Sequence, residues 1–156
     1  MSAKTIERFL KLLTDCCILY EAASYDLKGK KILNPNSKYY VADTGMRNAV
    51  LNFVSEDYGR LMENIVYLEL RRRGYSVLVG KCRCGDIDFI ARRGGSVEYF
   101  QVAYSMQDGE HADRELRSLR SAGDNHPKTV ISADRLAADF GDGIRHSNIV
   151  DWLLGA

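Results

Sequence analysis

GDIDFI at residues 85–90 and EYFQVAYS at residues 98–105 decide the fold of this chain. Both stretches are typical of β-strands, and the glycine-containing turn at residues 92–95 joins them as a hairpin. Residues two apart on a strand face the same way, so Asp88 shares a face with Asp86, and Gln101 shares one with Ala103. If the two strands pair, the Asp88 carboxylate and the Gln101 carboxamide approach each other.

The rest of the chain from residue 58 onward predicts an α/β core with the order α-β-β-β-α-β-α. Helices are expected over residues 60–73, 108–121 and 149–154, and strands over 75–80, 86–91, 97–104 and 128–132. The buried side of the first helix is predicted to include Leu61, Ile65, Tyr67 and Leu68, and that of the second to include Ala112, Leu116 and Leu119. The last strand is apolar enough to be central in the sheet.

Residues 1–57 predict a smaller α/β part. Helical spacing covers residues 4–13, extended pieces follow at 17–22, 31–33 and 38–43, a turn lies at 34–36, and a short helix runs from Thr44 through Phe53. A helix, a β-wing and a helix fit part of a winged-helix module, so we divide the chain into 1–57 and 58–156. The chain before Lys4 is too short for a recognition helix, which suggests a fragment or a module that completes a neighbouring domain.

Composition sets modest limits on function. The 156 residues are 46% hydrophobic and 28% charged with a net charge of +1, so nucleic-acid binding would depend on a local basic patch. Two such patches are candidates, and for both a solvated surface is the alternative. The candidate phosphate-binding residues are Lys28, Lys30, Lys31 and Lys38 on the wing, and Arg92 and Arg93 on the hairpin turn, to which Arg71, Arg72 and Arg73 add a rim.

The terminal sequence and the cysteines bear on location and metals. No apolar run approaches the ~20 residues of a membrane helix and the start lacks a signal peptide, so a cytoplasmic protein is expected. Cys16 and Cys17 are adjacent in an apolar stretch, which predicts buried thiols. Cys82 and Cys84 are separated by one residue, whereas zinc knuckles typically have a gap of two residues between their cysteines. Disulfides are not expected in a cytosolic chain.

The paired strands have the ligands of a magnesium site. Mg²⁺ prefers oxygen ligands, and Asp88, Gln101 and Glu63 on the preceding helix could supply three. Such a site would polarise a phosphodiester and activate water. A nearby cation would help, but Ala103 cannot provide one; Lys81 or Arg114 is a candidate to take that role.

Structural roles are the alternative for the same residues. Asp88 lies among apolar neighbours and would be satisfied by an ion pair with Arg114 as well as by a metal. Glu63 could pair with an arginine or form a buried hydrogen bond, and Gln101 could be hydrogen-bonded inside the fold. Tyr104 is expected to be a core residue.

The chain resembles a broad superfamily and, more closely, one specific group of domains. The core order, with Glu63, Asp88 and the triplet at residues 101–103, resembles the PD-(D/E)XK nuclease-like, restriction-endonuclease-like superfamily. A closer resemblance is to a C-terminal domain of unassigned function in prokaryotic AAA+-type ATPases. The segments that carry it are KYYVADTGMR at 38–47, ENIVYLEL at 63–70, RGY at 73–75, DFI at 88–90, QVAYS at 101–105, RE at 114–115 and GIRHSNI at 143–149.

This resemblance implies a degenerate nuclease fold attached to an ATPase. In active members the positions of Asp88 and Gln101 hold metal-binding acids and that of Ala103 holds the catalytic lysine. The implied function is a non-catalytic regulatory, nucleic-acid-binding or protein-interaction module; the alternatives are a Mg-dependent nuclease with a relocated cation and a purely structural domain. No P-loop sequence is present, so ATP would enter only through an N-terminal ATPase domain, the expected partner. An oligomer is compatible with all three.

Overall fold

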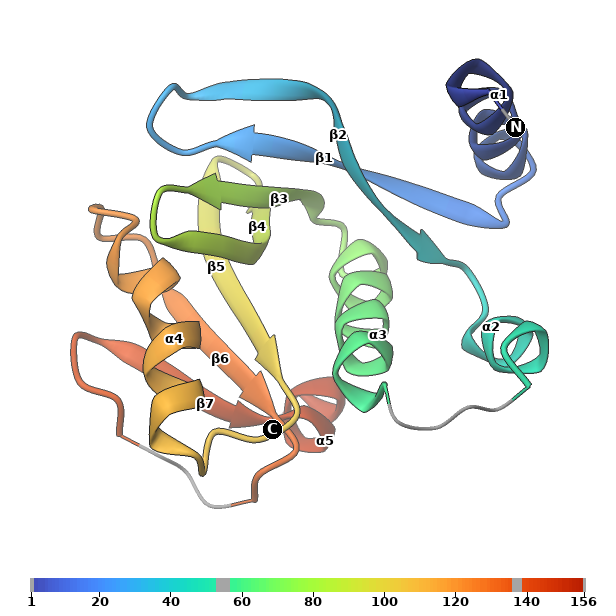
Figure 1. The fold of residues 1–156 in the computed structure, drawn as a ribbon. Coiled ribbons are helices and arrows are strands. Elements are labelled where there is room, and N and C mark those ends of the chain that lie inside the picture. Colours follow the sequence, from blue (N-terminus) through green and yellow to red (C-terminus); the bar gives the residue numbers. More distant parts are fainter. Residues whose placement is uncertain (1, 53–56, 136–138, 156) are drawn as a thin grey trace.

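A computed structural model describes residues 2–52, 57–135 and 139–155 as a mixed α/β fold (Figure 1). The strands of these residues form a seven-stranded sheet in the order β2-β1-β3-β4-β5-β6-β7. The strands are β1 (Leu19–Asp26), β2 (Lys31–Val41), β3 (Ser76–Cys82), β4 (Gly85–Arg93), β5 (Ser96–Ala103), β6 (Lys128–Ser132) and β7 (Ile144–Asn148). The helices are α1 (Ala3–Asp15), α2 (Thr44–Val50), α3 (Tyr58–Arg72), α4 (Gly109–Arg120) and α5 (Ile149–Leu154).

The second part of the chain has the predicted elements in the predicted order, with one additional strand, β7, before the last helix. β3, β4 and β5 pair antiparallel, and α4 then carries the chain across to β6, which lies parallel to β5. The central place predicted for residues 128–132 is confirmed, because β6 lies between β5 and β7. The sequence did not predict β7. Its residues after Ile144 are polar, so the strand depends on pairing with β6 rather than on an apolar pattern.

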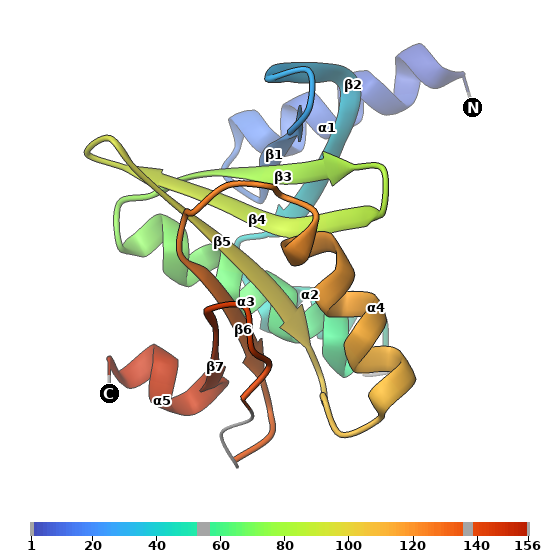
Figure 2. The same cartoon turned by 90° about the vertical axis from the view of Figure 1, so that its left-hand side faces the viewer.

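Side chains on the two faces of the sheet build two core clusters, and the register shift in the β3–β4 pairing interrupts the alternation between Ile87 and Phe89. Figure 2 shows α4 in front of the sheet and α3 behind it. Phe89, Phe100 and Val102 pack in one cluster with the buried residues of α3, and Trp152 of α5 joins them. The other cluster combines Ile87, Ile90, Tyr99 and Ala103 with the α4 residues Ala112, Leu116 and Leu119, all three of which are buried as predicted.

The buried side of α3 differs in part from the prediction. Tyr67 is fully buried as expected, whereas Leu61, Ile65 and Leu68 are only partly buried. The fully covered stripe is Met62, Val66 and Leu70, together with the polar Asn64 and Glu69. Buried polar groups are tolerated when they are hydrogen-bonded, and the side chains of Asn64 and Glu69 both have such partners. The buried side of the helix can therefore include them.

The first part of the chain extends the same sheet. β1 and β2 form a long hairpin, and β1 also pairs parallel with β3, so the sheet continues across the division expected at residue 57. The turn predicted at residues 34–36 is wrong: Ala23 pairs with Ser37 while Ser24 pairs with Leu33, so these three residues form a bulge inside β2. Phe53, the predicted end of the next helix, lies outside the described residues, and α2 ends at Val50.

The N-terminal helix stands apart from the others. Figure 1 shows α1 beyond one end of β1, away from the two helices that cover the sheet. Ile6, Phe9 and Leu12 of this helix are exposed. Among the described helices, none combines the length and the apolar character needed to cross a lipid bilayer.

Candidate functional site

The β4–β5 pair opens at the residues that the sequence singled out. The ladder runs from Arg93 opposite Ser96 to Phe89 opposite Phe100. At the next position, side chains take the place of the backbone groups in the hydrogen bonds between the two strands. The Val102 N–H donates to Asp88 Oδ2 at 3.0 Å, and the Asp88 N–H donates to Gln101 Oε1 at 3.3 Å. Gln101 therefore contacts the backbone of Asp88, while the Asp88 carboxylate contacts the backbone of Val102, at a point where the two strands separate.

A lysine from β2 lies at this opening. The Lys38 ammonium nitrogen is 2.9 Å from Glu63 Oε1 and 3.5 Å from Asp88 Oδ1, so one cation bridges the two predicted acids. Glu63 also accepts a hydrogen bond of 2.6 Å from the Tyr40 hydroxyl. Glu63 thus has the buried hydrogen bond that was one of its structural alternatives, with lysine in place of arginine as its ion-pair partner.

Two contacts explain why β2 reaches the site. Asn64 of α3 accepts a hydrogen bond from the Val41 N–H at 2.9 Å and donates one to the Val41 carbonyl at 3.0 Å. The Tyr40 ring stacks on Tyr67 with centroids 4.1 Å apart and also contacts Phe89. Because alternate strand residues share a face, fixing Tyr40 in the core also directs Lys38 toward α3.

Burial and neighbouring charge control the electrostatics of this cluster. Burial, then the charge of Glu63, raises the pKa of Asp88 to about 7, against the opposing effect of Lys38. Burial alone would lower the pKa of Lys38, but the charges of Asp88 and Glu63 raise it above its ordinary value, so the side chain stays cationic. Burial and Glu63 also raise the pKa of Tyr40, which keeps its hydroxyl protonated as a donor.

Gln101 is hydrogen-bonded inside the fold, as its structural alternative proposed. Its carboxamide nitrogen donates to Glu115 Oε2 of α4 at 2.7 Å, and its oxygen faces the Ser118 hydroxyl at 3.5 Å. Ala103 is buried among apolar residues and brings no charge to the site. Glu115 belongs to this hydrogen-bonded group and was not predicted as a site residue. The sequence offered one indication of it, since Glu115 is part of the RE segment at 114–115 that contributes to the family resemblance.

The cation in contact with Asp88 was not among those that the sequence suggested for this role. It is Lys38 of β2. Lys81 forms an ion pair with Asp86 at the start of the β3–β4 hairpin. The wing lysine Lys38 is therefore the cation of the acidic cluster, a role that its sequence context did not indicate.

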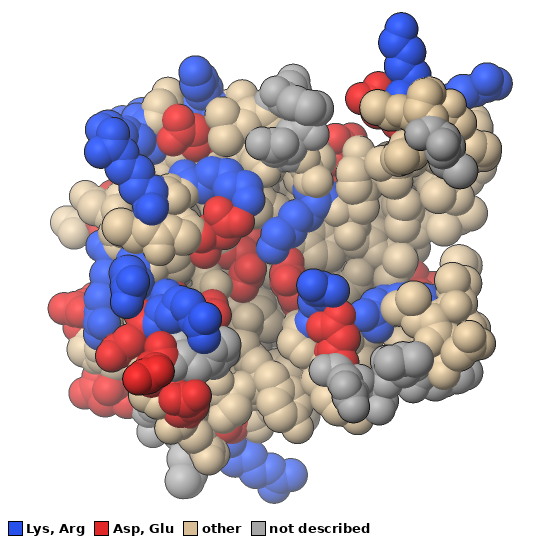
Figure 3. All heavy atoms as spheres, viewed as in Figure 1, with Lys and Arg blue, Asp and Glu red and all other residues tan. Residues whose placement is uncertain are grey.

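A pocket of about 430 Å³ lies beside the acids. Its lining includes Lys38, Tyr40, Arg47, Arg60 and Glu63. Arg47 and Arg60 both form ion pairs with Asp57, at 3.5 and 3.2 Å. Figure 3 shows basic and acidic side chains close together over the middle of this face of the molecule. The pocket thus joins the acidic cluster to a cationic wall.

The two predicted phosphate-binding patches are arranged differently. The Arg92 guanidinium lies over the Tyr25 ring at 4.5 Å, and that of Arg93 lies over the Tyr75 ring at 4.6 Å, so aromatic faces hold the arginines of the hairpin turn. Lys28, Lys30 and Lys31 lie at the tip of the β1–β2 hairpin, apart from Lys38 near the other end of β2.

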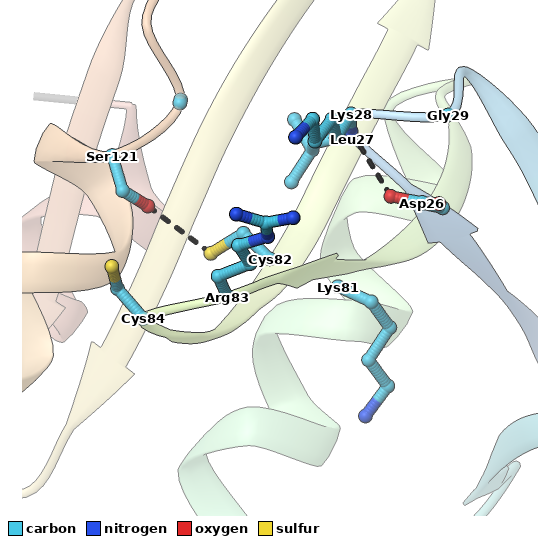
Figure 4. A pocket seen from close by; sticks show the side chains of 10 residues that line it. Asp26, Leu27, Lys28, Gly29, Lys81, Cys82, Arg83, Cys84 and Ser121 are labelled. Atoms are coloured by element: carbon cyan, nitrogen blue, oxygen red, sulfur yellow. Dashed lines mark hydrogen bonds between the residues drawn. The ribbon is translucent and has the colours of Figure 1, made fainter.

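A larger pocket, of about 910 Å³, lies at that hairpin tip. Figure 4 shows Lys28, Lys81 and Arg83 around it, with Cys82 and Cys84. Cys82 Sγ is 3.1 Å from Ser121 Oγ. In the described part of the chain all four cysteines are free thiols.

The prediction for Cys16 and Cys17 is wrong. Cys16 and Cys17 are exposed, not buried, because they follow a helix that packs only at the edge of the fold.

Within residues 2–52, 57–135 and 139–155, no group of three or more His, Cys, Asp or Glu side chains is arranged to hold a metal ion. Any ion at Asp88 would therefore depend on two carboxylates, the Gln101 oxygen and non-protein ligands.

Comparison with known proteins places the chain among longer relatives. A family model for a domain of unknown function (DUF8612) matches residues 1–57. An uncharacterized protein of Haemophilus influenzae is 39% identical over 98% of this chain, and the uncharacterized protein MJ1544 of Methanocaldococcus jannaschii is 32% identical over 78% of it. The alignments span only 38% and 27% of those two proteins. No solved structure matches the chain.

Proposed function

We propose that this domain is a metal-dependent phosphodiesterase of the nuclease type, in which Lys38 supplies the cation that Ala103 lacks. One observation carries the proposal: the Lys38 ammonium contacts both Glu63 and Asp88. A cation beside two acids, at the point where two strands separate, is the arrangement expected for phosphodiester hydrolysis. The sequence alone placed this lysine on a solvent-facing wing.

The arrangement of elements supports a PD-(D/E)XK nuclease-like core. α3 precedes three antiparallel strands, and α4 leads to β6, which is parallel to β5. Glu63 comes from the first helix of that unit, and Asp88 and Gln101 come from its second and third strands. The winged-helix assignment for residues 1–57 remains a separate proposal, since these residues contribute two strands to the same sheet.

The residues present fit a hard divalent cation. Glu63 and Asp88 would hold it as carboxylate ligands, because Mg²⁺ is commonly bound by one or two carboxylates together with water and substrate phosphate. Burial, and then the charge of Glu63, raises the pKa of Asp88, so the ionised carboxylate is destabilised in the folded protein and a divalent cation bound beside it would offset that cost. When bound, Mg²⁺ would lower the pKa of a water ligand and polarise a phosphoryl oxygen.

The chain's own groups would bind and orient the substrate. Lys38 lines the pocket, so its ammonium can pair with a phosphate oxygen and stabilise the negative charge that develops on it. Tyr40 fixes one oxygen of Glu63 through its 2.6 Å hydrogen bond. Arg47 and Arg60 give the same pocket a cationic wall that suits a polyanion.

A second candidate is the non-catalytic module of an AAA+-type ATPase. The observation that favours it is the pairing of Gln101 with Glu115 at 2.7 Å and of Asp88 with the Val102 N–H, which satisfies these groups without an ion. The greater length of the relatives is compatible with an ATPase partner domain, to which any ATP binding would belong. A cytoplasmic location suits both candidates.

Incubation with nucleic acid tests the proposal. The purified domain is mixed with plasmid, single-stranded DNA or RNA, with Mg²⁺ or Mn²⁺ present. Cleavage that stops on Asp88→Ala and on chelation supports the phosphodiesterase. Binding without cleavage under every condition supports the non-catalytic module instead.

A further inference from the structure

Two tyrosines form an exposed stacked pair next to the acidic cluster. The rings of Tyr58 and Tyr104 have centroids 5.6 Å apart and an interplanar angle of 27°. Their residues are 50% and 54% exposed, although the sequence predicted a core position for Tyr104. Each residue therefore keeps about half of its surface in contact with solvent, and this surface is available to a ligand.

The pair lies at the end of the elements that form the site. Tyr104 directly follows Ala103, the last residue of β5, and Tyr58 opens α3 five residues before Glu63. Gly59 lies one helical turn before Glu63, on the same side of the helix. A Cβ at Gly59 would find no atom within 4 Å, so the space over this turn is open.

Cationic side chains lie on the opposite flank of the same turn. Tyr58 and Arg60 stand on either side of Gly59 along the helix. The Arg60 side chain is 81% exposed and lines the pocket that also holds Lys38 and Arg47. The residues that line this pocket do not include either tyrosine of the stacked pair, so the aromatic pair and the cations lie on two sides of the same first turn of α3. A ligand that contacts both has flat faces and negative charges.

We propose that a nucleobase stacks on the Tyr58–Tyr104 pair, and that the substrate is therefore single-stranded nucleic acid; this deepens the proposed function and rests on it. Exposed aromatic rings beside cations are how proteins hold single strands, since every base has a stacking face and the cations follow the phosphates. In a duplex the faces of internal bases are covered by their neighbours, so they cannot reach such a pair without unstacking.

Equilibrium binding without divalent metal tests the inference separately from catalysis. Fluorescence anisotropy is measured in EDTA with a 12-mer of single-stranded DNA, its RNA counterpart, the DNA duplex, and an abasic strand of the same length and charge. We expect the single strands to bind more tightly than the duplex. The abasic strand should bind the unmodified protein about 5- to 150-fold more weakly than the base-containing strand.

Variants locate the effect. Tyr104→Ala and Tyr58→Ala should each weaken binding of the single strand by about 5- to 150-fold, whereas Tyr104→Phe keeps the ring and should bind like the unmodified protein. Phe9→Ala removes an exposed aromatic ring on the distant α1 and is the matched control. Equal binding of base-containing and abasic strands, or unchanged binding by both alanine variants, overturns the inference, as would be seen if the pair served a protein partner. Loss of cleavage alone would bear on the proposed function and leave this result intact.

Discussion

The Lys38 ammonium lies 2.9 Å from a carboxylate oxygen of Glu63, although the two residues are 25 positions apart and belong to a strand and a helix. Asn64, which follows Glu63 on the helix, forms two hydrogen bonds with the backbone of Val41 in β2, three residues beyond Lys38. The strand is therefore held against the helix at the place where its lysine meets the acids. Ala103 of β5 carries no charge. The cation beside the acids comes instead from Lys38 of β2, an edge strand of the sheet.

Removing the Asn64 side chain should loosen this arrangement. Asn64→Ala deletes both hydrogen bonds to Val41 and leaves a backbone N–H and carbonyl without these partners in a part-buried place. We expect the free energy of unfolding to fall by about 2–3 kcal/mol, measured by urea denaturation. Asn48→Ala is the control, because Asn48 accepts its hydrogen bond from the side chain of its neighbour Arg47. Equal losses in the two variants would contradict the role given to Asn64.

The Asp88 carboxylate should make the protein less stable as pH rises. Its folded pKa of about 7 lies above its ordinary value of 3.8, so the folded state binds more protons between these values and the free energy of unfolding falls across that window. Asp88→Asn is neutral and keeps an acceptor for the Val102 N–H. The pH-dependent loss of about 1–3 kcal/mol between pH 4 and 8 should therefore shrink in this variant.

Thermal melts at several pH values, with and without Mg²⁺, measure this effect. Mg²⁺ should raise the melting temperature of the unmodified protein at pH 8, where Asp88 is ionised, and leave that of Asp88→Asn unchanged. A parallel pH profile in both proteins would show that Asp88 is not the titrating group.

The acid Glu69 should have the opposite pH dependence. Hydrogen bonds from Arg72 and then Arg73 lower the pKa of Glu69 to about 2, from an ordinary value of 4.5. Its contribution to stability is complete above pH 4.5 and is lost as pH falls through 2. Glu69→Gln should therefore cost about 1–2 kcal/mol at pH 7 and progressively less toward pH 2.

Chemical denaturation at pH 7 and at pH 2.5 checks the Glu69 prediction. Asp113→Asn is the control, because the Asp113 side chain is 75% exposed and its 3.9 Å ion pair with Arg120 should contribute less than about 0.5 kcal/mol. A Glu69→Gln deficit that is the same at both pH values would contradict this account.

The Tyr40 hydroxyl should stabilise the acidic cluster. Tyr40→Phe keeps the ring stacked on Tyr67 but removes the 2.6 Å hydrogen bond to Glu63. The expected cost is about 1–2 kcal/mol in the free energy of unfolding. Tyr67→Phe removes a longer hydrogen bond, 3.5 Å to the Glu21 carbonyl, together with an interaction with Arg71, and should cost less. The reverse order of the two losses would argue against a fixed Glu63.

The core of the fold follows from local sequence signals. The strands around Asp88 and Gln101 have strong β patterns and a glycine turn, so their pairing was predictable. α3 was predictable as a helix, but its buried stripe was not. Two apolar rows compete on that helix. The choice depends on a partner for Asn64 that comes from β2, and on arginines at the end of the same helix for Glu69.

The composition of the site was only half predictable. Glu63, Asp88 and Gln101 are separated by short elements whose geometry is regular. Lys38 belongs to a hairpin whose pairing with the central sheet involves β1, and no local pattern in the sequence encodes that contact. The predicted turn at residues 34–36 also concealed that β2 continues to Lys38. Exposure of Tyr104 depends on where β5 ends, which the aromatic sequence around it does not specify.

Cleavage by a lysine variant tests the central claim most directly. Lys38→Met keeps the length of the side chain and removes its charge, and Lys31→Met makes the same change at the start of the same strand, away from the acids. With Mg²⁺ and a single-stranded substrate, we predict cleavage by the unmodified protein and by Lys31→Met, and a loss of about 100-fold or more for Lys38→Met. Cleavage by Lys38→Met at the unmodified rate, or none by the unmodified protein, would contradict the account.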